Sequence, residues 1–466
     1  MRHLPAWLIV LTVFAVAVAM RVPAIALHPM HTDEAVNAFL IDSLTQGGNF
    51  EYRLHDHHGP TLFLLAHALL PAGGWVAWEA WMPRLITAVA GALAAACLLL
   101  HAPVIGRGPA LASAVLLALL APFVFYGGVF IHESLLLALL VPWVASLWAW
   151  RCGRGVGLAV LVGVLTGLLL ATKETTGPIM LVLVLCLVPG AVHPWRRSFA
   201  HAAVAVLVAL VVVVLLFGDG GRAPERALNL FRAVAPQVDR GVGGIHAHPG
   251  DTYLRWYLLP GPAGPPWGCW LWLTLAAWGC WRQVLAARLA LASLLLGLGF
   301  SLLPYKTPWL ALAILLPLLP AAGLGAVALL ETLARRHSAL PIVAALAVVA
   351  VVGREAALRS WTAVPDTRDP LVYAPSAPGL DRLATELDGW RRSTDRPFTV
   401  QVVAGDAWPL PWYLRRLPAG FWAHPPATFL PGAVLVEPGQ VGLLAADDFR
   451  PVEVRPGLIL FLVRQP

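Results

Sequence analysis

The stretch His31-Thr32-Asp33-Glu34-Ala35 decides how the rest of the chain is interpreted. It follows an apolar run, residues 5–27, that is long enough to cross a bilayer. Two adjacent carboxylates at the mouth of a membrane helix lose hydration unless they are paired or used, so such acids mark candidate functional sites. The search for a site therefore starts at Asp33 and Glu34.

The composition is that of a membrane protein. Of the 466 residues, 59% are hydrophobic and 12% charged, and the mean hydropathy is +0.74, too apolar for a soluble globular chain. The net charge of +7 does not indicate nucleic-acid binding, because the arginines form small clusters between apolar runs and no basic face. The five cysteines have no CxxC spacing, so neither a zinc site nor a disulfide framework is predicted.

Apolar stretches that fit membrane spans recur along the chain. We expect about eleven of them, several being shorter than the usual ~20 residues. The first is expected to be a retained helix and not a removed signal peptide, because no small-residue cleavage site follows it. The predicted spans are residues 5–27, 81–100, 109–125, 130–150, 156–172, 177–192, 199–217, 266–281, 285–303, 308–330 and 339–353.

The arginines predict the orientation of these spans. With a cytoplasmic N-terminus every inside loop is basic, as the positive-inside rule requires. We therefore predict a multi-pass inner-membrane protein whose N-terminus is cytoplasmic and whose C-terminal part is extracytoplasmic. The inside arginines are Arg107, Arg151, Arg154, Arg196, Arg197, Arg282, Arg288, Arg335 and Arg336.

Two domains are expected. Residues 1–353 hold the spans and are predicted to form an all-α polytopic membrane domain. From residue 354 on, Pro, Arg and Asp become more frequent and helix-like segments alternate with strand-like ones, so residues 354–466 are predicted to form a small α/β domain. Its helices are expected at 380–391 and 412–416 and its strands at 398–404, 433–437 and 458–463.

The first outer loop, residues 28–80, is too long for a simple turn. Apolar residues at helical spacing predict a helix from Asp33 to Leu44, with Thr32 as its N-cap. A second apolar piece, Thr61 to Leu70, is about ten residues long and is expected to lie along the interface or to re-enter it.

Asp33 and Glu34 cannot share one task, because neighbours on a helix point about 100° apart. One is expected to face a cavity as a base while the other pairs with an arginine or caps the helix. The alternative is that both only favour the helix dipole. Arg84, at the outer end of the second span, either snorkels to lipid headgroups or grips a phosphate in a bidentate manner.

Other ionisable groups fall at the same predicted membrane level. The chain has only two lysines, Lys173 and Lys306, and both lie at outer helix ends, which suggests a chemical role for the ammonium. If the groups converge on one pocket, they offer carboxylates beside cations, which suits a reaction in which a phosphate leaves and a hydroxyl loses its proton. The alternatives are mutual neutralisation and a solvated loop. The further members are His58, His132, Glu133, Glu174, Tyr305, His246, His248, Asp251 and Tyr253.

The polar run before Gly59 contains consecutive histidines. His55, Asp56, His57 and His58 include metal-ligating types but lack any diagnostic ligand spacing. We therefore predict no cofactor, with a divalent metal as the alternative to a polar cavity lining or plain surface.

Several motifs, in this order and spacing, resemble a known family. They are Asp33-Glu34, His58-Gly59-Pro60, Met82-Pro83-Arg84, Lys173-Glu174, Tyr305-Lys306-Thr307-Pro308-Trp309 and residues 408–415. Together they resemble the flippase-activity-associated family of prokaryotic membrane proteins, which is similar to the protein O-mannosyltransferases (glycosyltransferase family 39) and the aminoarabinose transferases, with the GT-C fold.

The resemblance implies a glycosyltransferase that moves a sugar from a polyprenyl-phosphate donor on the outer leaflet. It implies that Asp33 deprotonates the acceptor, that Glu34 supports it, and that Arg84 and Lys306 hold the lipid phosphate. His132-Glu133 departs from the family, where an Arg and an Asp are more usual. The acceptor is unknown and does not follow from the resemblance, and no nucleic-acid partner is expected.

Two other classes of function compete with this one. A transporter or lipid-flipping helper would show matching halves and charges at the midplane of the membrane. Here the charges lie at outer helix ends and no halves match. A non-catalytic binding subunit would be favoured by loss of Asp33, which is present.

Overall fold

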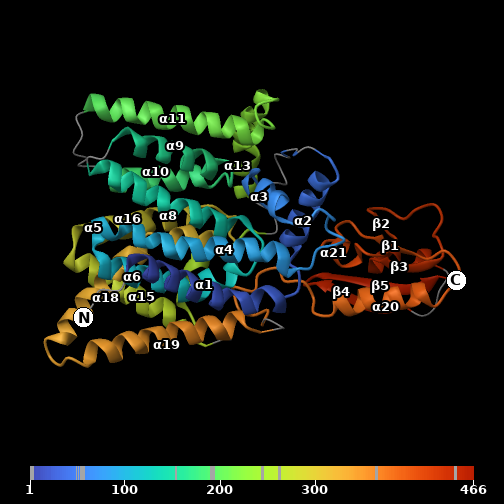
Figure 1. The fold of residues 1–466 in the computed structure, drawn as a ribbon. Coiled ribbons are helices and arrows are strands. Elements are labelled where there is room, and N and C mark those ends of the chain that lie inside the picture. Colours follow the sequence, from blue (N-terminus) through green and yellow to red (C-terminus); the bar gives the residue numbers. More distant parts are fainter. Residues whose placement is uncertain are drawn as a thin grey trace.

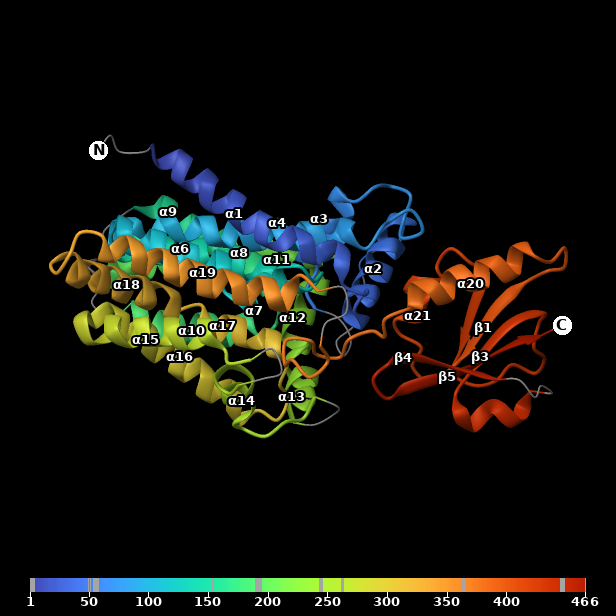
Figure 2. The same ribbon diagram turned by 90° about the horizontal axis from the view of Figure 1, so that it is seen from below.

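The computed structural model describes residues 5–465 apart from 49, 51, 53–57, 153–154, 189–194, 243–245, 261–263, 363–365 and 445–448. Long helices run side by side in one body, and a sheet domain projects from one end of it (Figure 1). The N-terminus lies at the opposite end. Figure 2 shows the same division from below, with the first outer loop between the two parts.

The chain is a polytopic, mostly helical membrane protein, as predicted. In its described part, six helices are long and apolar enough to cross a membrane, or up to eight if each of two bent helix pairs is one span. Each of the eleven predicted spans overlaps a helix or a bent pair. The three predicted spans beyond these eight correspond to shorter helices, α9 (Val156–Leu170), α10 (Thr176–Leu187) and α15 (Trp267–Arg282).

The helices of this body follow the predicted order. They are α1 (Ala6–Leu27), α4 (Trp81–Cys97), η1 (Leu98–His101), α5 (Ala102–Ile105), α6 (Arg107–Leu119), α7 (Ala121–Gly127), α8 (His132–Arg151), α9 (Val156–Leu170), α10 (Thr176–Leu187), α11 (Trp195–Phe217), α15 (Trp267–Arg282), α16 (Val284–Leu302), η3 (Pro308–Leu310), α17 (Ala311–Leu315), α18 (Leu318–Ala334) and α19 (Leu340–Ser360). Helix α19 continues beyond residue 353, where the sequence predicted the end of the membrane domain.

Two predicted spans are bent. Helices α6 and α7 meet at 57°, and the helix over Pro308–Leu315 meets α18 at 53°. Pro122 and Pro317 stand at these breaks, where proline removes a backbone donor and its ring clashes with the carbonyl four residues earlier.

A buried arginine satisfies the backbone at the first break. Arg21, fully buried in the middle of α1, sends Nη1 and Nη2 towards the bend between α6 and α7. A carbonyl left without a partner in the apolar interior costs free energy, so these hydrogen bonds stabilise the bend. The accepting carbonyl oxygens are those of Ala17 at 2.8 Å, Phe123 at 3.1 Å, and Leu117 and Ala118, each at 3.3 Å.

Helices α15 and α18 approach each other closely enough that only glycine fits between them. A Cβ added to Gly325 would lie 1.8 Å from the carbonyl oxygen of Leu275, and one added to Gly279 would lie 2.2 Å from that of Ala321. Small residues at helix crossings are typical of membrane bundles, where close backbone packing replaces the hydrophobic drive.

Short helices cover the end of the body from which the sheet domain projects. They are α2 (Thr32–Thr45), α3 (Thr61–Leu69), η2 (Pro224–Leu228), α12 (Asn229–Arg232), α13 (Val234–Val242) and α14 (Thr252–Leu258). The predicted helices of the first outer loop are therefore confirmed. The predicted N-cap is wrong: His31, not Thr32, caps α2, because its side chain accepts the N–H of Asp33 while Glu34 accepts the N–H of His31.

The C-terminal part is an α/β domain, as predicted. Its sheet has the order β2-β1-β3-β5-β4. Strand β1 is parallel to both β2 and β3, whereas β5 is antiparallel to both β3 and β4. The predicted strands at 398–404, 433–437 and 458–463 are β1, β3 and β5, and the short strands β2 and β4 were not predicted. The elements are α20 (Leu380–Arg392), β1 (Thr399–Val403), α21 (Leu410–Leu414), β2 (Ala419–Trp422), β3 (Gly432–Val436), η4 (Pro438–Leu443), β4 (Arg450–Arg455) and β5 (Leu458–Gln465).

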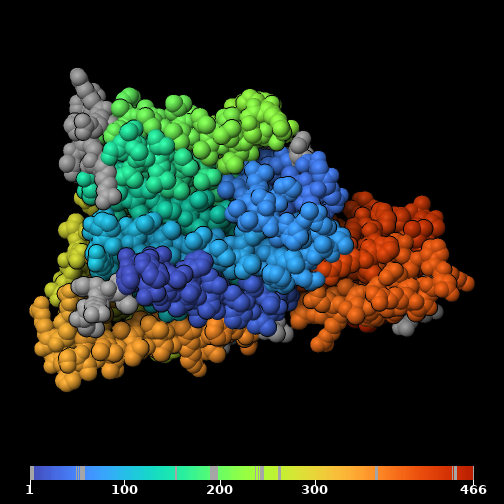
Figure 3. Space-filling model, viewed as in Figure 1, coloured from blue at the N-terminus to red at the C-terminus, as the bar shows by residue number. Residues whose placement is uncertain are grey.

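The sheet domain is docked on the first outer loop. Arg415, next to α21, donates to the carbonyl oxygens of Trp75 at 2.8 Å and Trp78 at 2.7 Å. The backbone N–H of Met30 donates to the hydroxyl of Tyr413 at 2.8 Å. In the space-filling view the domain meets the loop over a continuous surface (Figure 3).

Candidate functional site

Glu34 and Arg84 form a buried, bidentate ion pair. Arg84 Nε donates to Glu34 Oε1 at 2.7 Å and Nη2 to Oε2 at 2.6 Å, and each side chain is 1% exposed. The remaining guanidinium donors bond the carbonyl oxygens of Ile25, His28 and Pro29 at 2.8–3.1 Å. Arginine has five N–H donors, and all five are therefore occupied.

The carboxylate of Glu34 is equally well satisfied. It accepts the backbone N–H of Phe130 at 2.7 Å and that of His31 at 2.8 Å in addition to Arg84. Burial alone would raise the pKa of Glu34, but the Arg84 charge and these hydrogen bonds hold it below its ordinary value. The pair thus ties together the end of α1, the start of α4, the start of α2 and the turn before α8.

Asp33 lies beside this pair and is exposed. The Glu34 side chain turns into the protein, whereas Asp33, one residue earlier on α2, points elsewhere, as the helical offset predicted. Burial, together with the nearby charge of Asp33, raises the pKa of the Tyr373 hydroxyl. Asp33 therefore lies at the protein surface near Tyr373, on a helix start that the ion pair fixes.

Five predicted site residues come together in a second polar cluster. His58 Nδ1 lies 2.8 Å from Glu174 Oε2, and the rings of His58 and His132 are 4.9 Å apart. Lys173 and Glu133 form a buried ion pair. Residues from three predicted outer loops, 28–80, 126–133 and 172–177, therefore converge here.

Glu174 is the most strongly bonded carboxylate of this cluster. It accepts the hydroxyl of Tyr52 at 2.5 Å as well as the bond from His58. Burial acts to raise its pKa, but His58 and the hydrogen bonds outweigh burial and lower the pKa to about 2. Glu174 is therefore ionised at any working pH.

Tyr305 and Lys306 lie on another side of the site. Lys306 is 1% exposed, and its Nζ donates to the carbonyl oxygens of Leu303 at 2.5 Å and His248 at 3.1 Å. The ring of Tyr305 lies beside His246, with 5.2 Å between ring centroids. An ammonium has three donors, so these two bonds leave one N–H of Lys306 for a ligand.

Trp309 connects the three groups. It lines a small cavity together with Glu133 and Lys173, and it meets the ring of His31 edge-on at 6.0 Å. It follows Lys306 in the same loop and short helix. The predicted residues therefore surround the start of α2 without all contacting one another.

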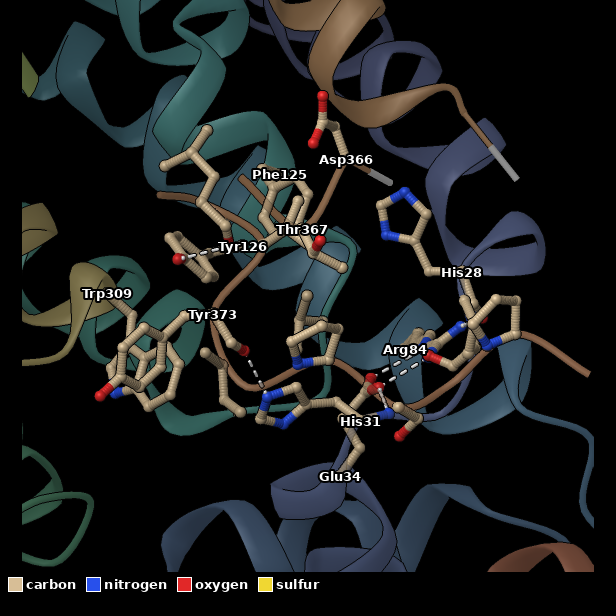
Figure 4. Close-up of a pocket in the computed structure, with 18 residues that line it drawn as sticks. His28, His31, Glu34, Arg84, Phe125, Tyr126, Trp309, Asp366, Thr367 and Tyr373 are labelled. Atoms are coloured by element: carbon tan, nitrogen blue, oxygen red, sulfur yellow. Dashed lines mark hydrogen bonds and ion pairs between the residues drawn. The ribbon is translucent and has the colours of Figure 1, made fainter. Parts of the chain in front are cut away.

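A cavity of about 310 Å³ lies next to the ion pair, beneath residues 366–376. These residues, here called the strap, link α19 to the sheet domain. Figure 4 shows Trp309 and Tyr373 on one side of this cavity and His28 and Arg84 on the other. Aromatic and aliphatic side chains make most of the wall, and a few polar groups point into it, the usual make-up of a small-molecule site.

The strap is held at several points. Tyr126 Oη donates to the carbonyl oxygen of Leu371 at 2.9 Å, and His31 Nε2 donates to that of Tyr373 at 2.9 Å. The Tyr373 hydroxyl lies 2.8 Å from His246 Nδ1 and 3.0 Å from His248 Nε2. His246 and His248, from the predicted outer loop of residues 218–265, thus contact the strap through Tyr373.

Several of these residues escaped sequence reasoning. Tyr373 lies in the segment assigned to the C-terminal domain, and no local pattern marks it. His28 and His31 flank the acidic pair, and this proximity was the available signal. Tyr126, at the end of α7, directly follows a predicted span and has no charged neighbour to mark it.

Metal binding is not supported within the described residues, where no three His, Cys, Asp or Glu side chains are grouped to hold an ion. His55, Asp56 and His57 lie outside the described residues. His58 is bonded to Glu174.

None of the protein-family models and none of the curated sequences compared with the chain matches it. Solved structures do match it. ArnT from Cupriavidus metallidurans bound to undecaprenyl phosphate covers 98% of this chain and 97% of its own, with a TM-score of 0.67 and 16% identity. The Archaeoglobus fulgidus oligosaccharyltransferase, in complex with zinc and sulfate, covers 93% of this chain and 68% of its own, with a TM-score of 0.61 and 12% identity. The chain has the GT-C fold.

The GT-C fold predicted from the motifs is thus confirmed over nearly the whole chain. The apo state of the same ArnT gives a TM-score of 0.65 at 15% identity, again over 98% of this chain. At sequence identities this low, the structural match establishes the fold alone. The roles of individual residues in this GT-C chain have to be argued from its own geometry.

Proposed function

We propose that this chain is a membrane glycosyltransferase that moves a sugar from a polyprenyl-phosphate donor to an acceptor on the extracytoplasmic side. The observation that carries the proposal is the exposed carboxylate of Asp33, on a helix start fixed by the buried Glu34–Arg84 pair at the outer end of an apolar bundle. Support also comes from the GT-C fold, which the chain shares with an ArnT that was solved with undecaprenyl phosphate.

In this proposal Asp33 acts as general base. The acceptor hydroxyl oxygen attacks the anomeric carbon, the bond from that carbon to the phosphate oxygen breaks, and the hydroxyl proton passes to Asp33. Polyprenyl phosphate leaves with the electron pair. A single displacement inverts the anomeric centre, and a retaining route would need a second carboxylate as nucleophile.

The lipid part of the donor has a suitable groove. A groove of about 620 Å³ runs between α9, α10 and α11, and its wall is apolar except at Glu174 and Thr166. Its outer end therefore reaches the cluster that contains His58 and Lys173. We assign the prenyl chain to this groove, because an apolar chain is stabilised there. We assign the phosphate to the space beyond Glu174, on the side of His58 and Lys173, because the lysine ammonium attracts a phosphate whereas the ionised Glu174 repels it.

The roles of the cations differ from the family-based expectation. Arg84 has no donor left for a phosphate, so we assign it a positioning role through Glu34. Lys306 retains one donor and stays the second phosphate contact, with His58 and Lys173 on the groove side. Positioned cations away from bulk water lower the barrier to departure of a phosphate.

The test is transfer of radiolabelled sugar by purified protein in lipid, with a panel of polyprenyl-phosphate donors. The transfer rate of Asp33→Asn is expected to be lower than that of wild type by a factor of ~10² or more, the range of general-base catalysis. Asp219→Asn, an exposed aspartate at a left-handed position (φ 51°) that asparagine tolerates, serves as the matched control. No turnover with any donor, together with unchanged donor binding by Asp33→Asn, would favour a lipid-flipping or binding role and overturn the proposal.

A further inference from the structure

The cavity beneath the strap contains a buried polar atom without a partner. His28 is 8% exposed and lines the cavity, and its Nε2 has no hydrogen-bond partner. Its ring lies against Phe125, with centroids 5.3 Å apart. Buried polar groups in folded proteins are almost always bonded, so an unpaired nitrogen at a cavity wall indicates a ligand group.

His28 is uncharged at neutral pH. Burial, and then the charge of Arg84, lower its pKa to about 4. A neutral imidazole exchanges a hydrogen bond with a hydroxyl in either direction, because one ring nitrogen donates and the other accepts. Figure 4 shows the ring directed towards Asp366 and Thr367 of the strap, across the space that a ligand would fill.

The other charged groups of the cavity wall are already neutralised. Glu34 is paired with Arg84, and Asp366 is bonded to Arg368 at 2.7 and 2.9 Å. His31 uses Nδ1 as acceptor and Nε2 as donor, which is the arrangement of a neutral ring. The wall therefore offers an entering cation no unpaired carboxylate, and Asp33, although it lies near Tyr373, is not part of the wall.

The wall is shaped for one small ring. A volume of about 310 Å³ lies at the low end of the range for small-molecule sites. Tyr126 and Trp309 supply aromatic surface, with their rings edge-to-face and 5.9 Å apart. A monosaccharide ring combines apolar faces with hydroxyls at its edge, and this cavity combines aromatic surface with a few hydrogen-bonding atoms.

We propose that the cavity beneath the strap binds an uncharged, hydroxyl-bearing sugar ring and that His28 Nε2 hydrogen-bonds one of its hydroxyls. The inference rests on the proposed function and narrows its substrate class to neutral sugars, against sugars that carry an ammonium group. The ring belongs either to the donor or to a glycan acceptor, since both present the same chemistry.

The primary experiment measures binding and needs no turnover. Wild-type protein in lipid nanodiscs is titrated calorimetrically with the methyl glycosides of mannose, glucose and galactose and with that of 4-amino-4-deoxyarabinose. We expect at least one neutral glycoside to bind about tenfold or more tightly than the amino glycoside. His28→Phe, which keeps an aromatic ring beside Phe125, is expected to weaken that binding about tenfold, the loss of one buried hydrogen bond.

The matched control is His101→Phe. His101 is a histidine buried elsewhere among the helices, 3% exposed, and does not line the cavity. His28→Asn, which restores a hydrogen-bonding group, is expected to recover part of the affinity. If His28→Phe does not fold, the comparison of His28→Asn with wild type carries the test.

Two further arms separate the sources of the sugar. If the ring is that of the donor, wild type prefers polyprenyl-phosphate mannose, or the cognate glycosyl donor, over bare polyprenyl phosphate, and His28→Phe loses this preference. If the ring is that of an acceptor, the preference is unchanged while binding of the free glycoside falls.

The proposal is overturned if no neutral glycoside binds, if the amino glycoside binds as tightly as the neutral ones, or if His28→Phe binds like wild type. Failure of the proposed function is recognised separately, because it is measured as transfer by Asp33 variants and these bindings do not depend on that step.

Discussion

Replacing Arg84 by methionine tests whether the pair with Glu34 holds the outer corner of the bundle together. Methionine keeps much of the apolar length of the side chain and removes all five donors. Glu34 would then be a buried carboxylate without a cation, and the carbonyls of Ile25, His28 and Pro29 would lose their partner.

The structure sets the expected size of this effect. Removing one partner of a buried ion pair costs about 3–5 kcal/mol. Because Glu34 keeps the N–H groups of His31 and Phe130, we expect the lower end, about 3 kcal/mol. The Arg416–Glu79 pair is about half exposed at a similar distance, 2.8 Å, so Arg416→Met should cost about 1 kcal/mol or less.

The assay is thermal unfolding of purified protein in one detergent, followed by the fluorescence of its 20 tryptophans. Arg84→Met should melt well below Arg416→Met, and the double variant Glu34→Gln with Arg84→Met should regain part of the loss, because no charge is then stranded. The reasoning is refuted if Arg84→Met and Arg416→Met have the same melting temperature. It is also refuted if the double variant is destabilised by more than the sum of the losses of the two single variants.

Three further predictions concern other parts of the molecule. Since the pKa of Glu174 falls from its ordinary 4.5 to about 2 on folding, its stabilisation is complete above pH 4.5 and is lost as the pH falls towards 2; the melting temperatures of wild type and Glu174→Gln should therefore converge on acidification from pH 5 to 3. Lys173→Met strands the buried Glu133 and should lower the melting temperature more than Lys173→Met combined with Glu133→Gln does; equal losses would show that the pair is not coupled. Gly325→Ala should destabilise by about 1–3 kcal/mol or more through overpacking, whereas Gly299→Ala, whose Cβ would meet no atom within 4 Å, should leave unfolding nearly unchanged.

Much of the fold could be predicted because the local amino-acid composition identifies membrane helices. Within the described residues, apolar length located every span-length helix of the body, and helical spacing located α2 and α3. The bends were missed although Pro122 and Pro317 lay inside predicted spans, because a helix break hardly changes the hydropathy of an apolar run. Strand β2 was missed because it has only four residues and none is buried, and β4 because only Val454 of its six residues is buried.

Many residues of the site could be predicted from the sequence, but not all of the hydrogen bonds between them. The convergence of His58, His132, Glu133 and Lys173 follows from their common membrane level. The five bonds of Arg84 do not, because three of them go to backbone carbonyls, whose positions depend on the tertiary turn after α1. For the same reason no pattern marked Tyr373, which reaches the site only because the chain returns across it after α19.

That return path has a mechanical consequence. The strap is both the link to the sheet domain and a wall of the cavity, fastened through Leu371 and Tyr373. We expect any tilt of the sheet domain about the end of α19 to displace Leu371 and Tyr373, so that a movement of the domain would change the cavity. Extra residues inserted into the strap would uncouple the cavity from the domain, whereas insertions in the exposed turns of the sheet would leave this coupling intact.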